Sequence, residues 1–200
     1  MYDFFLRCDG GRMAELRRVS AGSAHGHVVE IGCGTGLNFE YYDWQRVDRL
    51  DATEPDPFML KRARHRLEAL PGGVRERVHL HEVTAEDLPF GEATFDAAVS
   101  TLVLCTVRDP SLAARELHRV LKPGARLYLV EHVRGSGPLA TAQRLLQPLW
   151  GWFAAGCHLD RNTEVVVAAS GLRLTVQERF KLAPLLPAVR GFATKEQERL

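Results

Sequence analysis

The chain of 200 residues has the length of one ordinary domain, and its 26 lysines and arginines nearly balance 25 aspartates and glutamates. The resulting net charge of +1 does not favour nucleic acid or an anionic membrane as the main partner. With 46% hydrophobic residues, 17 glycines and 10 prolines, the composition excludes collagen-like, fibrous and disordered chains. We therefore expect a single domain over 1–200 that acts on a small molecule and not on nucleic acid.

The four cysteines are widely spaced and form neither a CxxC pair nor another pattern of metal ligands. We expect reduced thiols, no metal and a cytoplasmic protein. The N-terminal run MYDFFLRCDGGR contains four charged residues, so we expect no signal peptide and no N-terminal anchor. The longest uncharged run, Leu145–Leu159, contains Pro148 and falls short of the ~20 residues of a transmembrane helix.

From residue 26 onward, short β-rich runs alternate with helical patterns, which predicts an α/β domain with a parallel sheet covered by helices on both faces. The predicted strands are His27–Gly32, Arg49–Thr53, Val78–Glu82, Phe95–Ser100 and Arg126–His132, followed by two near Leu172–Phe180 and Arg190–Ala193. Apolar residues at helical spacing predict helices over 1–20, Pro57–Leu70, Ser111–Leu121, which Pro123-Gly124 would stop, and about Asn162–Ser170.

A glycine-rich loop, Gly32–Gly36, directly follows the first predicted strand and leads into a helix expected to start near Leu37. Glycines at such a turn permit positive φ and let a ligand approach the backbone, although a tight turn without a ligand is the alternative. Glu54 ends the second strand, where a carboxylate can accept both hydroxyls of a ribose. Glu30 precedes the loop and suits an ammonium group better than a pyrophosphate. The G-x-G-x-G spacing also disfavours a nicotinamide-dependent oxidoreductase, whose fingerprint is G-x-G-x-x-G.

The segments VVEIGCGTG, ATEPDPFMLKRA, AEDLPF, FDAAVSTLVLC and LHRVLKPGARLYLVEHV, spread over residues 28–133, resemble in order and spacing the motifs of class I S-adenosylmethionine-dependent methyltransferases. STLVLCTV, EHV and GCHLDRNTE further resemble the small-molecule thiol methyltransferases of mammalian microsomes and their bacterial relatives. The resemblance implies a Rossmann-like, doubly wound, mostly parallel seven-stranded sheet with S-adenosylmethionine as cofactor. It also implies an N-terminal helical segment (1–25), a cofactor-binding core (26–133) and an acceptor-side lid with C-terminal strands (134–200).

The same resemblance implies the residues of the cofactor site. They are Glu30, Gly32 and Gly34 at the methionine end with Cys33 between them in the loop, Glu54 at the ribose, Pro55 beside the adenine, Ala85 and Glu86 at the adenine edge, and Thr101 at the sulfonium. This chain has Thr84 where the wider class often has an aspartate.

Methyl transfer from a sulfonium mainly requires a positioned nucleophile and the exclusion of water. A thiol acceptor, with a free pKa of about 8.5, also needs a base or a positive field. The candidate bases are His132, at the carboxyl end of the fifth strand, and His158, with packing as the alternative role of each. The candidates for an acceptor pocket are Cys105, Trp150 and Cys157, which can instead be plain core residues.

The Trp-bearing segment Leu145–Phe153 has several interpretations: a lid over an apolar acceptor, a membrane-surface contact, a dimer face or core packing. We prefer the lid, because only Arg144 supplies a nearby positive charge for an anionic membrane. We therefore expect methyl transfer to a small, fairly apolar acceptor, with a thiol as the best candidate. The alternatives are a phospholipid-amine or quinone methyltransferase acting at a membrane surface, and a cofactor-binding domain without catalysis. The oligomeric state stays open.

Overall fold

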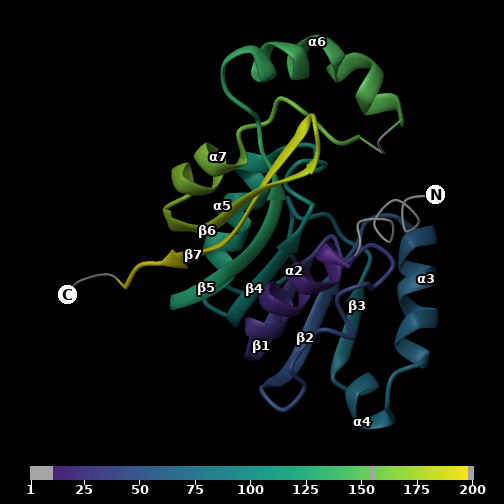
Figure 1. Ribbon diagram of the computed structural model, residues 1–200. Coiled ribbons are helices and arrows are strands. Elements are labelled where there is room, and N and C mark those ends of the chain that lie inside the picture. The colour runs from purple at the N-terminus through teal and green to yellow at the C-terminus, as the bar shows by residue number, and fades with distance from the viewer. Residues whose placement is uncertain (1–10, 154–155, 198–200) are drawn as a thin grey trace.

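Seven strands form one sheet in the order β3-β2-β1-β4-β5-β7-β6 (Figure 1). The structure is a computed structural model that describes residues 11–153 and 156–197. Its strands are β1 (Gly26–Ile31), β2 (Val47–Thr53), β3 (Val78–His81), β4 (Phe95–Thr101), β5 (Leu121–His132), β6 (Leu172–Ala183) and β7 (Leu186–Lys195). Its helices are α2 (Arg12–Ser20), the 3₁₀ helix η1 (Ala21–Ser23), α3 (Pro57–Glu68), α4 (Gly72–Arg75), α5 (Pro110–Val120), α6 (Gly137–Phe153) and α7 (Thr163–Ala169).

The pairing of the strands confirms the α/β, doubly wound and mostly parallel sheet. β1 to β5 pair in parallel, while β7 runs antiparallel to both of its neighbours, β5 and β6. The strand order reverses beside β1, because β2 and β3 lie on one side of it and β4 and β5 on the other. In open α/β sheets such a switch point leaves a crevice at the carboxyl ends of the strands, which is where ligands bind.

All seven predicted strands are present, with ends that differ by a few residues from the sequence prediction. The helix predicted over Ser111–Leu121 is confirmed as α5, which ends one residue earlier, at Val120, but the prediction that Pro123-Gly124 stops it is wrong. Leu121 already pairs with Phe95 of β4, so Pro123 and Gly124 lie within β5, where the pairing register shifts. Of the helix expected over 1–20, the structure describes α2, and residues 1–10 lie outside the described residues.

Two Asp-Pro pairs determine where α3 and α5 begin. The Asp56 carboxylate accepts hydrogen bonds from the backbone N–H groups of Phe58 and Met59 at 2.8 and 3.2 Å. Asp109 caps α5 in the same way, and in both helices proline follows the cap. An aspartate cap with proline at the first helical position is a strong local start signal. The cap at Asp56 thereby places the end of β2 directly against the start of α3.

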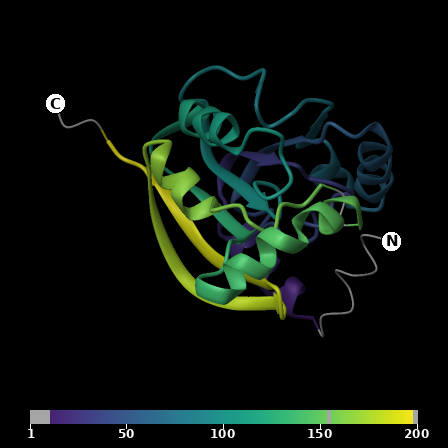
Figure 2. The same ribbon diagram turned by 90° about the horizontal axis from the view of Figure 1, so that it is seen from above.

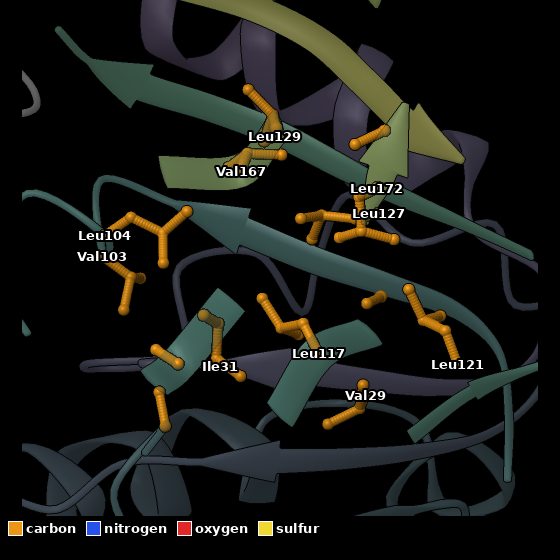
Figure 3. Packing of buried hydrophobic residues seen from close by; sticks show 14 of the residues in the cluster. Val29, Ile31, Val103, Leu104, Leu117, Leu121, Leu127, Leu129, Val167 and Leu172 are labelled. Atoms are coloured by element: carbon orange, nitrogen blue, oxygen red, sulfur yellow. The ribbon is translucent and has the colours of Figure 1, made fainter. Parts of the chain in front are cut away.

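Alternate side chains of the central strands enter two cores on opposite faces of the sheet. Val29 and Ile31 pack with Leu117 of α5 in the cluster drawn in Figure 3. Val28 points the other way and packs with Leu60 of α3. Because both faces of β1 are buried, its backbone is held firmly up to the residue that precedes the glycine loop.

Helix α6 lies across the carboxyl edge of the sheet instead of covering a face (Figures 1 and 2). Its outer surface exposes Leu145 and Leu149, whose side chains are 71% and 66% accessible. No helix in the described part of the chain is both long and apolar enough to cross a bilayer.

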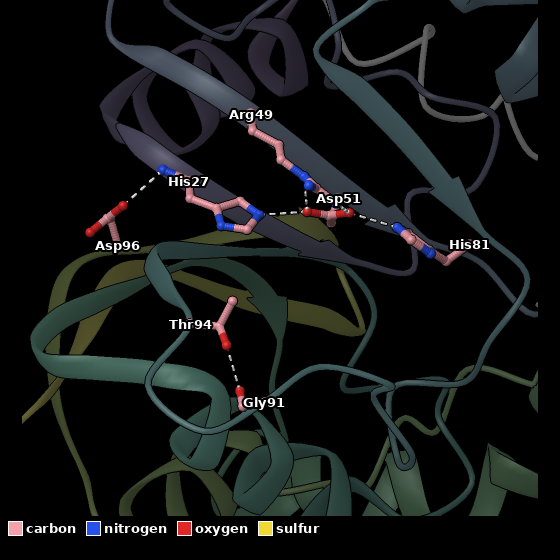
Figure 4. A network of polar contacts seen from close by, with 7 residues as sticks. All are labelled: His27, Arg49, Asp51, His81, Gly91, Thr94 and Asp96. Carbon is pink, nitrogen blue, oxygen red and sulfur yellow. Dashed lines mark hydrogen bonds and ion pairs between the residues drawn. The ribbon is translucent and has the colours of Figure 1, made fainter.

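A buried carboxylate ties the three strands at one side of the sheet together (Figure 4). Asp51 of β2 accepts hydrogen bonds from His27 of β1 at 2.6 Å, from His81 of β3 at 2.7 Å and from Arg49 at 2.8 and 2.9 Å. Its side chain has no exposed surface. Burial raises the pKa of this carboxyl, but the three hydrogen-bonding partners outweigh burial and lower the pKa from 3.8 to about 2.

We predict that Asp51→Asn lowers the free energy of unfolding at neutral pH by about 2 kcal/mol, the value linked to this pKa difference. A carboxyl whose pKa is lower in the folded state contributes stability above the unfolded-state pKa. Its contribution is therefore lost as the pH falls from about 4 to about 2. Urea unfolding of wild type and Asp51→Asn across this range measures the effect, with Asp48→Asn, an exposed position of β2, as the control. A destabilisation of Asp51→Asn that stays constant down to pH 2 contradicts the assignment.

Candidate active site

A cavity of about 400 Å³ opens at the switch point, where β1, β2 and β4 end. All nine residues that the sequence assigned to the cofactor line this one cavity: Glu30, Gly32, Cys33, Gly34, Glu54, Pro55, Ala85, Glu86 and Thr101. They come from the ends of β1, β2 and β4 and from the segment after β3. The topology thus brings together motifs that lie up to 71 residues apart in the chain, from Glu30 to Thr101.

The glycine loop forms the floor of the cavity through two residues with positive φ. Gly32 has a φ of 55°, and a Cβ there would lie 2.6 Å from the side chain of Val103. Gly34 has a φ of 57°, and a Cβ there would meet no atom within 4 Å. The first glycine is therefore required by the protein's own packing, whereas the second leaves open space over the backbone for a ligand.

The helix expected to start near Leu37 is absent, and this prediction is wrong. Residues 34–40 form successive turns, with backbone hydrogen bonds from Gly36 to Cys33, from Phe39 to Gly36 and from Tyr41 to Asn38. Positive φ at Gly34 and Gly36 prevents a regular helix from starting there. The turns instead bring Asn38 and Tyr42 back beside the end of β1.

Glu30 is the centre of a buried polar network. Its two carboxylate oxygens accept hydrogen bonds from the Asn38 amide at 2.8 Å and from the Tyr42 hydroxyl at 2.8 Å. The same amide nitrogen of Asn38 also donates to the Thr101 hydroxyl at 3.1 Å, and its oxygen accepts from the Arg17 guanidinium at 2.7 Å. Arg17 is 7% exposed and lines the cavity from α2.

The network leaves the Glu30 carboxyl close to its titration midpoint at neutral pH. Burial raises its pKa from 4.5 to about 7, although the hydrogen bonds from Tyr42 and Asn38 and the charge of Arg17 act in the opposite direction. Burial also raises the pKa of the Cys33 thiol, with further contributions from Glu30 and Glu54. A thiol with a raised pKa is a poor nucleophile, so Cys33 fills space in the loop.

The second carboxylate of the cavity, Glu54, is fixed by two backbone groups. One oxygen accepts from the N–H of Gly34 at 2.9 Å and the other from the N–H of Asp56 at 3.0 Å. Glu54 therefore links the glycine loop to the start of α3. Glu86, which also lines the cavity, accepts from the backbone N–H of Asp109 at 3.1 Å.

The predicted acceptor residues come together, but behind the wall of the cavity. This wall is the segment from Thr101 to Arg108. The backbone N–H of His158 donates to the carbonyl of Cys105 at 2.8 Å, and the Arg161 guanidinium donates to the carbonyls of Leu104 and Val107 at 2.9 and 2.6 Å. The 157–161 segment therefore braces the wall from outside. None of Cys105, Cys157 and His158 lines the cavity itself.

The two thiols behind the wall influence each other's ionisation. The Cys157 thiol and burial both raise the pKa of Cys105. The Cys105 thiol lowers the pKa of Cys157, although burial opposes the change. Burial and the charge of Arg161 lower the pKa of His158.

Three side chains near the end of β5 and on α6 carry buried polar atoms that lack a hydrogen-bond partner within the described residues: Glu131, His132 and Trp150. Glu131 uses only one oxygen, which accepts from Ser100 and from the backbone of the cavity wall. Neither the ring nitrogens of His132 nor the indole N–H of Trp150 make a hydrogen bond of standard geometry within the described residues, although the His158 backbone acts on the pKa of the His132 ring and Trp150 acts on the pKa of the Cys157 thiol. Burial lowers the pKa of His132 to about 4, so its ring is neutral at neutral pH. His132 does not line the cavity.

Comparison with known proteins identifies the family. Residues 29–129, half of the chain, match the family described as a methyltransferase domain, and the match contains the glycine loop, Glu54 and Thr101. The chain belongs to the class I S-adenosylmethionine-dependent methyltransferases. The enzyme is therefore a methyltransferase, and its cofactor is S-adenosylmethionine.

Several relatives of the methyltransferase resemble it over most of its length. The thiol S-methyltransferase TMT1B of Rattus norvegicus is 35% identical over 182 residues, which cover 84% of this chain and 70% of that protein. The phosphatidylethanolamine N-methyltransferase of Cereibacter sphaeroides is 31% identical over 193 residues, covering 92% and 87%. Among solved structures, the YcgJ protein of Bacillus subtilis has a TM-score of 0.78 at 18% identity and covers 94% of this chain and 99% of its own. That likeness concerns the fold alone.

The cavity of the methyltransferase fits its cofactor by the chemistry of its side chains. It offers the buried carboxylate of Glu30 linked through Asn38 to the guanidinium of Arg17, a second carboxylate at Glu54, and open space over the backbone at Gly34. Three residues of this arrangement, Arg17, Asn38 and Tyr42, were missed from the sequence. No local motif marks them, since each acts only because the turns and α2 fold back onto the end of β1.

We predict that Glu54→Ala weakens the binding of S-adenosylhomocysteine at least about tenfold, because hydrogen bonds to a charged group contribute about 1.5–3 kcal/mol. The variant also loses the link between the glycine loop and α3. Isothermal titration calorimetry measures the affinity, and Glu82→Ala, an exposed position outside the cavity, is the control. Equal affinities of wild type and Glu54→Ala would remove Glu54 from the cofactor site.

Proposed function

We propose that this methyltransferase transfers the methyl group of S-adenosylmethionine to small, fairly apolar thiols. The observation that carries the proposal is the 35% identity with a thiol S-methyltransferase along 84% of the chain. The end of the cavity near Thr101 is consistent with such an acceptor, since Leu102, Val103 and Val107 line it with apolar side chains. A site of this kind excludes water and favours a small apolar nucleophile.

In this proposal the two ends of the polar network hold the methionine part of the cofactor. The Glu30 carboxylate receives the α-ammonium group, and the Arg17 guanidinium receives the α-carboxylate. Asn38 donates to Glu30 and accepts from Arg17, so it fixes the spacing of the two charges. A carboxylate and a guanidinium that are held by the same amide present one negative and one positive charge at a fixed spacing. This arrangement complements the ammonium and carboxylate groups of an amino acid.

The remaining predicted residues hold the nucleoside part. Glu54 accepts the ribose hydroxyls, while Pro55, Ala85 and Glu86 surround the adenine. Glu54 is already oriented by two backbone N–H groups before any ligand binds, which reduces the cost of ordering the site. When bound, the cofactor supplies a sulfonium methyl group for in-line displacement by the acceptor.

The acceptor, we infer, approaches past Leu102. This residue lines the cavity and has a φ of 59°, a left-handed conformation that costs a non-glycine residue roughly 1–3 kcal/mol. Such strain is typical of functional sites. Leu102 packs on a buried cluster formed by Met13 and Leu16 of α2 and Val130 of β5, so these two elements hold the residue at this approach.

His132 is the candidate that accepts a hydrogen bond from the acceptor thiol, a role that requires the acceptor to reach past the lining of the cavity to the end of β5. Its ring is neutral, and neither ring nitrogen makes a hydrogen bond of standard geometry among the described residues, although the His158 backbone lies near enough to raise the pKa of the ring. The indole N–H of Trp150 lies in the same region, beside the Cys157 thiol whose pKa it lowers. Cys105, Cys157 and His158 support the wall from behind and are positioning residues in this proposal.

One observation favours a different acceptor. Leu145 and Leu149 are exposed on α6, the helix that lies across the carboxyl edge of the sheet (Figure 1), and exposed leucines can contact a membrane surface. The relative from Cereibacter sphaeroides is a phosphatidylethanolamine N-methyltransferase. A phospholipid amine is therefore the second candidate.

A methyl-transfer screen tests the proposal and its alternatives. Wild type and His132→Ala receive small thiols, quinols, and vesicles of phosphatidylethanolamine. We predict turnover of the thiols, with a loss in His132→Ala that shrinks as the pH approaches the thiol pKa of about 8.5, where the acceptor ionises in solution. A loss that is equal at every pH would make His132 a packing residue. Turnover of the lipid alone would replace the thiol acceptor, and cofactor binding without any turnover would indicate a non-catalytic domain.

The raised pKa of Glu30 gives a second prediction. Because the ammonium group binds the ionised carboxyl, the affinity for S-adenosylhomocysteine falls by up to about tenfold per pH unit below about pH 7 and is constant just above it. Glu30→Gln abolishes this dependence and weakens binding at about pH 8. Calorimetry over this range measures both effects, with Glu40→Gln, an exposed position, as the control. A wild-type affinity that does not change between about pH 6 and pH 8 contradicts the role of Glu30.

A further inference from the structure

A second concave site lies at the opposite edge of the sheet, near the amino ends of β1 and β2. It is a cavity of about 250 Å³, and we call it the arginine pocket. Three arginines line it, Arg46 before β2, Arg126 of β5 and Arg190 of β7, together with Tyr128 and Phe192. No aspartate or glutamate is among its lining residues. Three arginines therefore line one cavity in a protein whose total net charge is only +1.

Two of these arginines are held in place from the protein side. The guanidinium of Arg126 stacks on the ring of Phe192, 4.5 Å from its centre. Arg190 donates to the carboxylate of Glu178 and to the amide of Gln177, each at 3.2 Å. Antiparallel pairing places Phe192 opposite Tyr128, so the two rings form one wall of the pocket. Ordered guanidinium groups lose little conformational freedom when they bind a ligand.

The nearby carboxylates are already used by other partners. The two oxygens of Glu178 accept from Arg12 at 2.6 Å and from Arg190 at 3.2 Å. Asp96, in the adjoining groove, accepts from Lys122 at 2.6 Å and from the backbone of His27. Within the described part of the chain, neither Arg46 nor Arg126 has an ion-pair partner. The pocket thus carries positive charge that the protein does not neutralise.

We propose that the arginine pocket binds a phosphate group, presented either by a small phosphomonoester or by the headgroup of a phospholipid. A carboxylate has two coplanar oxygens and satisfies one guanidinium, whereas a phosphate offers three or four tetrahedral oxygens to several donors at once. A phosphomonoester also carries about −1.5 to −2 charges at pH 7, which matches a site with more than one uncompensated guanidinium.

This site is separate from the methyl-transfer site. The cofactor cavity lies at the carboxyl ends of β1, β2 and β4, and the two cavities have no lining residue in common. The failure of one assignment therefore leaves the other intact. Helix α2 contacts both, with Arg17 at the cofactor cavity and Ser20 at the arginine pocket.

Calorimetry with inorganic phosphate and with glycerol phosphate tests the proposal, together with co-sedimentation with phosphatidylcholine vesicles that contain or lack phosphatidic acid, a lipid whose headgroup is a phosphomonoester. We expect phosphate-dependent binding by wild type that weakens at least about tenfold in Arg126→Gln and falls with added salt. Arg173→Gln is the matched control, because Arg173 lies on β6 outside the pocket and pairs with Glu196. Titration with S-adenosylhomocysteine verifies that each variant is folded.

The two sources of phosphate give different results. Binding of glycerol phosphate assigns the pocket to a soluble phosphomonoester, while binding only of the vesicles with phosphatidic acid assigns it to a lipid headgroup. In both cases Arg126→Gln must reduce the binding and Arg173→Gln must not. The proposal is overturned if no phosphate-bearing probe binds, or if Arg126→Gln binds as tightly as wild type.

Discussion

The arrangement of the site depends on one buried carboxylate, that of Glu30 at the end of β1. A carboxylate in a protein interior is costly unless hydrogen bonds compensate for lost water. Here the amide of Asn38 and the hydroxyl of Tyr42 supply those bonds, and this requirement draws the turns of residues 34–40 back against the strand. Asn38 then reaches Arg17 on α2 and Thr101 at the end of β4. The carboxylate thus connects three separate parts of the chain around one cavity.

The sequence was sufficient to predict the residues that belong to local motifs. It was not sufficient to predict the residues whose role depends on tertiary packing. Gly32, Gly34 and Glu54 were identified because a strand end, a glycine loop and an acidic residue at a fixed distance form a local pattern. Arg17, Asn38 and Tyr42 have no such pattern, since their role depends on tertiary contacts with Glu30. The helix expected near Leu37 failed for a related reason: positive φ at two glycines replaced helical geometry with turns.

The surroundings of the candidate acceptor residues likewise could not be predicted from the sequence. Side chains alternate along β5, so Glu131 turns toward the cavity wall, while Val130, two residues before His132, packs on α2. The sequence placed His132 at the correct end of the strand but had no means of determining its surroundings. The 157–161 segment was also expected near the acceptor, and its contacts with the backbone of 104–107 could not be read from a motif. Through these contacts the 157–161 segment supports the backbone of residues 104–107.

We propose that the Glu30 network and Glu54 hold S-adenosylmethionine at the carboxyl edge of the sheet. A crystal structure of the protein with S-adenosylhomocysteine tests this arrangement. We expect the α-ammonium group of the ligand within hydrogen-bond distance of Glu30, its α-carboxylate at Arg17, and its ribose hydroxyls at Glu54. A ligand bound in this cavity with its methionine end away from Glu30, or bound elsewhere on the protein, would contradict it.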